Sequence, residues 1–416
     1  MKRALGAPMR VRGQALIAAL LLALLLAAAS LLGGGELRMR SNAVAHARSV
    51  AALAQARDAL IGYAISYDER HPGEGYGFLP CPDSGNSGST PIGACGARDL
   101  GALGRLPWRT LGLADLRDGW GECLWYAVAG SIKHNPKPLL LNWDNAGQFA
   151  LQAADGRMLA AAAPDRLAVA VVFAPGPPLP GQLRPSAPGR ACSGSASAAA
   201  DLSSYLEGDY PATVSGTLTV AAGEQPDGAQ GRRNDLIAWI GIDDLFDALR
   251  RRADHPDQVD ALITTAADAL ASRLDDADFI AAHSEGSAGL LRIGLLPAGA
   301  ALGLPAPDRL RLERWRDQFR FAVCTDGSAC IDAELDPPSA TLACRGVLLF
   351  GGERLRSGVG QQQRITPQQR ADPAQYFEGD NARHLSQGIP HFSGAARFRV
   401  ADPHQPATAD VVRCLP

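Results

Sequence analysis

Residues 120–128 read WGECLWYAV, and residues 315–323 read WRDQFRFAV. Each stretch starts with tryptophan and continues into an aromatic and apolar run that is typical of a β-strand. Four more pairs of short matches surround these two stretches in the same order, separated by 171 to 195 positions. The pairs are 106–113 with 296–304, 171–173 with 348–350, 205–209 (YLEGD) with 376–380 (YFEGD), and 235–237 with 410–412. Five matches in one order indicate an internal repeat whose loops differ in length.

The residues around the repeat predict one helix and several strands in each copy. Residues 36–67 are rich in alanine, lack proline and space their apolar residues as a helix does. A loop rich in Gly, Pro, Ser and Asn follows. Strand-like runs then occupy 123–130, 149–153 and 167–174. The second copy also opens with a helix pattern, over 243–274 with Pro256 as a break. The expected fold class is therefore α+β.

The first 35 residues have the pattern of an export signal or a membrane anchor. Residues 1–13, MKRALGAPMRVRG, carry four basic side chains and no acid, and residues 15–32 include one polar residue. This apolar run of about 18 residues reaches the lower limit for a helix across a bilayer, so we expect residues 14–35 to span a membrane. The basic flank predicts a cytoplasmic N-terminus and an exported body. Three routes stay open: a secretory signal cleaved near 27–30, an uncleaved signal anchor, and a short leader ending at Gly13.

Several stretches resemble the exported part of type IV pilin-like proteins and type II secretion pseudopilins. They are ARDALIGYAISYD (56–68), FLPCPD (78–83), GRLPWRTLGL (104–113) and DGWGECLWYAV (118–128). The Trp-Gly pair followed by an aromatic strand is similar to the pseudopilin segment at the end of the helix-to-sheet loop. The stretches YLEGD and NDLIAWIGIDDLF (234–246) resemble later parts of large prepilin-like proteins. The resemblance covers residues 10–250 directly and residues 250–416 through the repeat.

The resemblance implies a long membrane-spanning helix followed by two tandem pilin-like domains, each with a helix packed on an antiparallel sheet. The expected parts are a basic leader (1–13), a transmembrane helix (14–35), a first pilin-like domain that includes the extended helix (36–242), and a second pilin-like domain (243–416). It also implies a single-pass protein of the bacterial inner membrane with a periplasmic body. An extracellular filament is the further location that this family implies.

In this family a prepilin peptidase cuts after the glycine that ends the basic leader. Carried over to this chain, the cut would follow Gly13 and make Gln14 the first mature residue. The first mature residue of the family is usually Phe or another apolar residue. The fifth, here Ala18, is usually Glu, whose carboxylate pairs with a neighbour's N-terminal amine. A subunit without this Glu resembles the minor pilins or pseudopilins at a filament tip, and the same residues also fit an ordinary signal anchor.

The function that the resemblance implies is structural. We expect a minor pilin or pseudopilin that primes, caps or decorates a type IV pilus or a type II secretion filament. Its partners would be the prepilin peptidase, other pilin or pseudopilin subunits and the inner membrane. No GxSxG elbow, HExxH motif or Walker loop occurs, so we expect no enzyme. Two alternatives stay open: a signal-anchored periplasmic binding or adhesion protein, and an exported hydrolase with an unrecognised site.

A formal net charge of −3 without a basic stripe argues against nucleic-acid binding. The eight cysteines are expected to form disulfides outside the cytoplasm, since no CxxC motif or nearby histidine favours a metal site. Two pairs would close local polar loops, and the other four cysteines would then join each other, although eight cysteines allow many pairings. The favoured pairs are Cys81 with Cys95, Cys324 with Cys330, Cys123 with Cys192, and Cys344 with Cys414.

The Glu-Gly-Asp motifs at 207–209 and 378–380 are the best acidic candidates for a binding site. Carboxylates and loop carbonyls bind Ca²⁺, and some pseudopilins use such a loop. The alternative is a tight turn in which glycine supplies the backbone conformation and the acids face water. We favour the turn, so no cofactor is expected and calcium is the less favoured reading.

Overall fold

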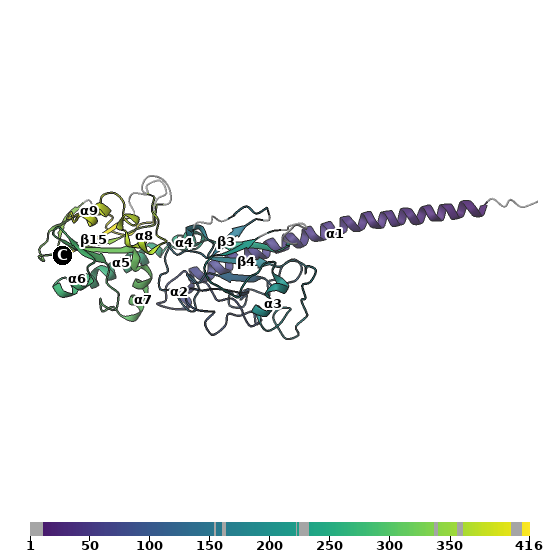
Figure 1. The fold of residues 1–416 in the computed structure, drawn as a ribbon, viewed down its shortest axis with the longest axis horizontal. Coiled ribbons are helices and arrows are strands. Elements are labelled where there is room, and N and C mark those ends of the chain that lie inside the picture. Colours follow the sequence, from purple (N-terminus) through teal and green to yellow (C-terminus); the bar gives the residue numbers. More distant parts are fainter. Residues whose placement is uncertain are drawn as a thin grey trace, which may run out of the picture.

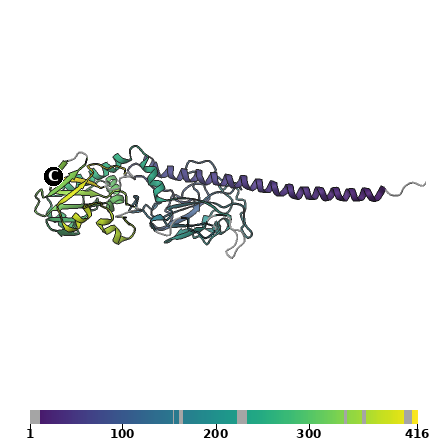
Figure 2. The same cartoon turned by 90° about the horizontal axis from the view of Figure 1, so that it is seen from above.

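The computed structural model describes residues 11–153, 155–159, 164–221, 223, 233–336, 340–355, 361–400 and 410–416. Helix α1 (Val11–Ile65) is 55 residues long, and its side chains are described for residue 17, for 19–24 and from residue 37 onward. The helix starts far outside the folded body and ends inside it (Figures 1 and 2). Short helix α2 (Tyr67–Arg70) follows. The second half of α1 buries residues at helical spacing, namely Ala45, Ala52, Leu53, Ala56, Leu60 and Ala64.

The first sheet has five antiparallel strands in the order β5-β1-β2-β4-β7. They are β1 (Gly101–Arg105), β2 (Trp125–Val128), β4 (Ala170–Ala174), β5 (Thr213–Val214) and β7 (Leu236–Ile240). Trp125 lies opposite Arg105 on one side and Phe173 on the other. Helix α1 packs on β4 and β7, and α3 (Ala198–Tyr205) packs against β1. Every residue of β1, β2 and β4 is therefore buried, which explains the lack of polar alternation in β2 and β4.

The second sheet is also antiparallel, with the order β8-β9-β10-β13-β15. Its strands are β8 (Gly286–Ala288), β9 (Leu291–Leu295), β10 (Phe319–Cys324), β13 (Gly346–Phe350) and β15 (Val411–Leu415). Phe319 lies opposite Phe350, as Trp125 lies opposite Phe173 in the first sheet. Helix α5 (His255–Ala271) packs on β13 and β15. In both sheets, then, a helix covers the two strands at one edge.

Smaller elements complete the body. A two-stranded parallel sheet joins β3 (Phe149–Gln152) to β6 (Leu218–Ala221), and a three-stranded sheet has the order β12-β11-β14 with β11 and β14 parallel. The other strands and helices are β11 (Ile331–Leu335), β12 (Ala340–Cys344), β14 (His391–Gly394), α4 (Ile242–Arg250), α6 (Ala277–His283), α7 (Ala306–Trp315), α8 (Pro367–Ala371) and α9 (Asn381–Gln387). The helix expected over 243–274 occurs as α4 and α5, and Pro256 lies in the first turn of α5.

The structure corrects the expected fold. In place of a membrane-spanning helix followed by two tandem pilin-like domains, it is a mixed α/β fold with several antiparallel sheets and two parallel strand pairs. No helix in the part of the chain described here is long and apolar enough to cross a membrane, so the membrane span expected over 14–35 is wrong.

The same finding contradicts the expected single-pass location in the inner membrane. Four disulfides are present, which is typical of an oxidising, exported compartment. The disulfide prediction is therefore confirmed. The boundary expected between residues 242 and 243 falls at the first residues of α4, and the division of the chain into two domains stays a prediction.

Candidate assembly interface

Helix α1 presents two different surfaces along its length. Its second half is buried against the first sheet, whereas its first half extends away from the body (Figure 1). The described residues from 17 to 24 are all Ile, Leu or Ala, and all are exposed. Ile17 and Leu24 expose 61% and 65% of their surface. A helix that is apolar on every side is stable in water only when other apolar surfaces surround it. This part of α1 is the candidate assembly interface.

The predicted cleavage position lies at the start of the same helix. Gly13 and Gln14 belong to α1, while the leader residues 1–10 lie outside the described part of the chain. The side chain of Ala18 is also outside it. Cleavage after Gly13 therefore stays a prediction.

The second half of α1 is fixed to the body by contacts that the sequence motif DGW explains. The amide of Gly119 donates to Ser49 Oγ at 2.9 Å. A Cβ atom added at Gly119 would lie 1.8 Å from the carbonyl oxygen of Ala45, so only glycine lets this loop approach the helix. Further along, Arg57 pairs with Asp244 at 2.8 Å and donates through Nε to the carbonyl of Trp239. Movement of α1 is thereby coupled to β7 and α4.

Gly119→Ala is expected to lower the free energy of unfolding by about 1–3 kcal/mol, because the added methyl group forces α1 away from the sheet. Urea unfolding of the purified chain measures this loss. Gly93→Ala is the matched control, since a Cβ there meets nothing within 4 Å, and it should change stability by less than about 0.5 kcal/mol. Equal stability of the two variants would contradict the close approach of Gly119 to α1.

The cysteines form four disulfides in the described chain, and none of them is free. The bonded pairs are Cys81 with Cys95, Cys123 with Cys192, Cys324 with Cys330, and Cys344 with Cys414. These are the four pairs that the sequence analysis favoured. Two bonds close local loops, and the other two join segments 69 and 70 residues apart, so they restrict the unfolded chain most strongly.

The first Glu-Gly-Asp motif lies in a partly buried hydrogen-bond network, here called the first network: Gln182, Arg184, Tyr205, Glu207 and Asp235. Arg184 donates to Gln182 Oε1 at 2.7 Å, and its guanidinium lies 4.8 Å from the centre of the Tyr205 ring. Gln182 donates to Glu207 Oε1 at 2.8 Å. The amide of Glu207 then donates to Asp235 Oδ2 at 2.8 Å. The chain of contacts links the loop after β4 to the start of β7.

The second Glu-Gly-Asp motif has the same surroundings, here called the second network: Gln362, Arg364, Tyr376, Glu378 and Asp410. Arg364 donates to Gln362 Oε1 at 2.7 Å and lies 4.4 Å from the centre of the Tyr376 ring. Gln362 donates to Glu378 Oε1 at 3.0 Å, and the amide of Glu378 donates to Asp410 Oδ2 at 3.1 Å. Four contacts therefore recur between equivalent residues of the two networks, and the second links the loop after β13 to the start of β15.

Burial raises the pKa of one aspartate in each network. Removal from water raises the pKa of Asp235 well above its usual range, and the neighbouring Glu207 carboxylate raises it further. Burial and Glu378 raise the pKa of Asp410 in the same way. Beside the second network, burial raises the pKa of Asp317 to about 6, against the attraction of Arg370. These carboxyl groups resist ionisation because a buried charge is costly.

The outer acids of both motifs face water, as a tight turn requires. Asp209 is exposed, and Asp380 is exposed and pairs with Arg383 at 3.0 Å. Gly379 has a φ of 59°, a left-handed conformation that favours glycine. Among the described residues no group of three or more His, Cys, Asp and Glu side chains could hold a metal ion. The exposed outer acids and the left-handed Gly379 fit a tight turn.

The two sheets meet at a junction that the sequence did not indicate. Trp143, from the loop before β3, packs edge-on against Trp315 with ring centres 4.6 Å apart, and it also contacts Phe246, Phe350 and Phe398. The next residue, Asp144, accepts from Arg364 at 3.1 Å and from Gln318 at 2.7 Å. One loop of the first half of the chain thus reaches the second network. This loop lies outside the five repeat matches, so the sequence analysis gave no signal for it.

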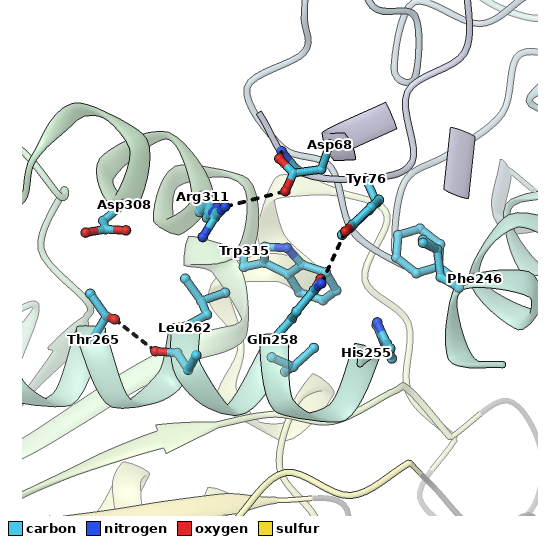
Figure 3. A pocket seen from close by; sticks show the side chains of 14 residues that line it. Asp68, Tyr76, Phe246, His255, Gln258, Leu262, Thr265, Asp308, Arg311 and Trp315 are labelled. Carbon is cyan, nitrogen blue, oxygen red and sulfur yellow. Dashed lines mark hydrogen bonds and ion pairs between the residues drawn. The ribbon is translucent and has the colours of Figure 1, made fainter. Parts of the chain in front are cut away.

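A cavity of about 260 Å³ lies beside this junction, between α5, α7 and the loop after α2. Figure 3 shows Leu262 and Trp315 on its apolar side. Tyr76 accepts from Gln258 at 3.2 Å, and Asp68 pairs with Arg311 at 3.5 Å (Figure 3). These two polar contacts close the cavity on the side of the first sheet. The contacts of Tyr76 with Gln258 and of Asp68 with Arg311 join the first half of the chain to the second half at this cavity.

No family model, curated protein or solved structure matches this chain. The structure of the chain has two distinctive features, namely the exposed apolar part of α1 and the two matching networks.

Proposed function

We propose that the chain is a structural subunit of the minor pilin or pseudopilin kind, which primes, caps or decorates a type IV pilus or a type II secretion filament. The observation that carries this proposal is the exposed, wholly apolar surface of α1 from residue 17 to 24. Helices of neighbouring subunits would surround it in a bundle. Burial of each Leu or Ile side chain there contributes roughly 1.5–3 kcal/mol to association.

The way in which α1 enters the body supports the same role. The second half of the helix packs on β4 and β7 and is held by Ser49 and Arg57. A helix that is exposed at one end and built into a sheet at the other transmits its position in a bundle to the whole body. The body then lies outside the bundle, where it can present a surface.

The proposal extends to processing and partners. A prepilin peptidase would cut after Gly13 and release Gln14 as the first residue, and other pilin or pseudopilin subunits would supply the surrounding helices. Ala18 offers no carboxylate for a neighbour's N-terminal amine, which favours a place at a filament tip. The chain itself would catalyse no reaction.

Site-specific photo-crosslinking in cells tests the proposal. A photoreactive phenylalanine analogue in place of Leu21 is expected to give adducts with pilin or pseudopilin subunits, because Leu21 is 55% exposed on the apolar part of α1. The same analogue at Leu183, which is 79% exposed on the body, is the matched control and should give no such adduct. Adducts at Leu183 alone, or no protein adduct at Leu21, would sink the proposal.

A further inference from the structure

In each network two carboxyl groups lie close enough for their side chains to interact, Glu207 with Asp235 and Glu378 with Asp410. Asp235 and Asp410 are 2% and 5% exposed. Within the described residues, Asp235 Oδ1, Asp410 Oδ1 and Glu378 Oε2 are buried oxygens without a hydrogen-bond donor. Two ionised carboxylates so placed would repel each other, and unpaired buried oxygens are costly. One proton per pair removes both costs, because a protonated carboxyl group donates a hydrogen bond to its ionised neighbour.

We propose that Glu207 with Asp235, and Glu378 with Asp410, each hold one proton between their carboxyl groups at neutral pH, and that the chain thereby carries two pH-sensitive latches. Each latch fixes a Glu-Gly-Asp turn to the start of an edge strand, β7 or β15. The turn is held through the glutamate amide, which donates to the aspartate in both copies. Loss of the proton places two negative charges in the same buried space and loosens the turn.

The groups around the first pair are mixed in charge. Arg184 lowers the pKa of Asp235, against the larger effects of burial and Glu207. Tyr210 lies close enough to interact electrostatically with both Asp235 and Glu207, and Arg233 interacts with Tyr210. Glu207 Oε2 accepts from the amides of Asn234 and Asp235 at 2.9 and 3.1 Å.

The second pair has more acidic surroundings. Asn381 donates to Asp410 Oδ2 at 2.9 Å. The pair lines a cavity of about 690 Å³, together with Glu334, Asp336 and Arg399. Two further acids and one cation therefore line the same cavity as the pair, and the excess of acids favours retention of the proton.

The sign of the pH effect follows from the direction of the shift. The pKa of each aspartate is raised in the folded chain above the value of ~3.9 that an unfolded aspartate has. The stabilising effect is complete below the unfolded pKa and is lost as the pH rises through the folded pKa. Between these limits folding takes up one proton per pair, so the folding equilibrium constant falls about tenfold per pH unit for each pair and about a hundredfold for both.

The experiment compares the wild-type chain with the double variant Asp235→Asn and Asp410→Asn. Asparagine keeps a hydrogen-bond donor in the place of the carboxyl O–H group and does not titrate. Urea unfolding is measured between about pH 5 and pH 9. The folding equilibrium constant of the wild-type chain is expected to fall more steeply with pH than that of the double variant, by up to a hundredfold per pH unit. The matched control replaces the exposed acids of the same turns, Asp209→Asn with Asp380→Asn. It should leave the pH dependence of the folding equilibrium constant unchanged.

Infrared spectroscopy of the folded wild-type chain at pH 7 keeps the proposal testable if a variant does not fold. The carbonyl band of a protonated carboxyl group is expected, and it should shrink stepwise in the two single Asp→Asn variants. The proposal is overturned if the wild-type chain lacks this band, or if the double variant keeps the wild-type slope. Neither readout depends on filament assembly, so this test can fail while the proposed function stands.

Discussion

Trp143→Ala is expected to lower the free energy of unfolding by about 3–5 kcal/mol. The indole is 3% exposed and fills the centre of an aromatic cluster between the two sheets. Its removal leaves a cavity lined by Trp315, Phe246 and Phe350. This cavity cannot close, because α7, α4 and β13 hold the three rings in place. Urea unfolding followed by circular dichroism measures the loss. A second, earlier transition is also expected, since the junction no longer couples the two halves.

Trp239→Ala is the matched control for this variant. Trp239 lies on edge strand β7 and is 39% exposed, so its removal leaves no closed cavity. A clearly smaller loss and a single transition are expected. If both tryptophan variants lost the same stability, Trp143 would not be the anchor of the junction.

Arg364→Met is expected to lower the free energy of unfolding by about 3–5 kcal/mol, because it leaves Asp144 buried with its main partner gone. Arg364 is fully buried and donates to Asp144, Gln318 and the carbonyl of Gly352. It also lies over the ring of Tyr376. Chemical unfolding at pH 7 measures the effect.

A double-mutant cycle separates the ion pair from the other contacts of Arg364. Asp144→Leu removes the carboxylate, and the double variant Asp144→Leu with Arg364→Met removes both charges. The double variant is expected to lose less stability than the sum of the single variants, by about 1–3 kcal/mol. Strict additivity would show that Asp144 and Arg364 do not depend on each other.

The sequence predicted those features whose residues lie close together in the chain. The repeated tryptophan stretches lead into β2 and β10, and the runs at 149–153 and 167–174 contain β3 and β4. Local spacing also led to the pairs Cys81 with Cys95 and Cys324 with Cys330, and the two long-range pairs followed from the four cysteines that remained. Such features depend on alternation, turn residues and short-range closure, all of which can be read from one stretch at a time.

Features that depend on distant residues could not be predicted. In the sequence, Asp235 and Asp410 were only the first residues of the matched segments 235–237 and 410–412. The folded chain brings them to Glu207 and Glu378 at the starts of β7 and β15. The ion pair of Asp144 could not be predicted for the same reason, because its partner Arg364 lies 220 positions away. Nothing in a single sequence specifies which buried charge such a loop will meet.

The membrane expectation rested on the apolar residues near the N-terminus alone. The apolar run near the N-terminus met a minimal length for a span, yet no helix in the described part of the chain satisfies that criterion. A wholly apolar helix surface has a second physical explanation, namely burial among other helices. The proposed assembly role uses this explanation.

The most direct test of that role is the amount of this chain recovered with purified filaments from the cells that make it. The wild-type chain is compared with the double variant Leu21→Arg and Leu24→Arg, and with the control Leu139→Arg and Leu183→Arg on exposed sites of the body. Equal amounts of disulfide-bonded chain must be present in all three cultures. Loss of two buried leucines at roughly 1.5–3 kcal/mol each predicts at least about a hundredfold less of the first variant in the filaments. The control variant should be recovered like wild type. Undiminished recovery of the Leu21→Arg and Leu24→Arg chain would contradict assembly through α1.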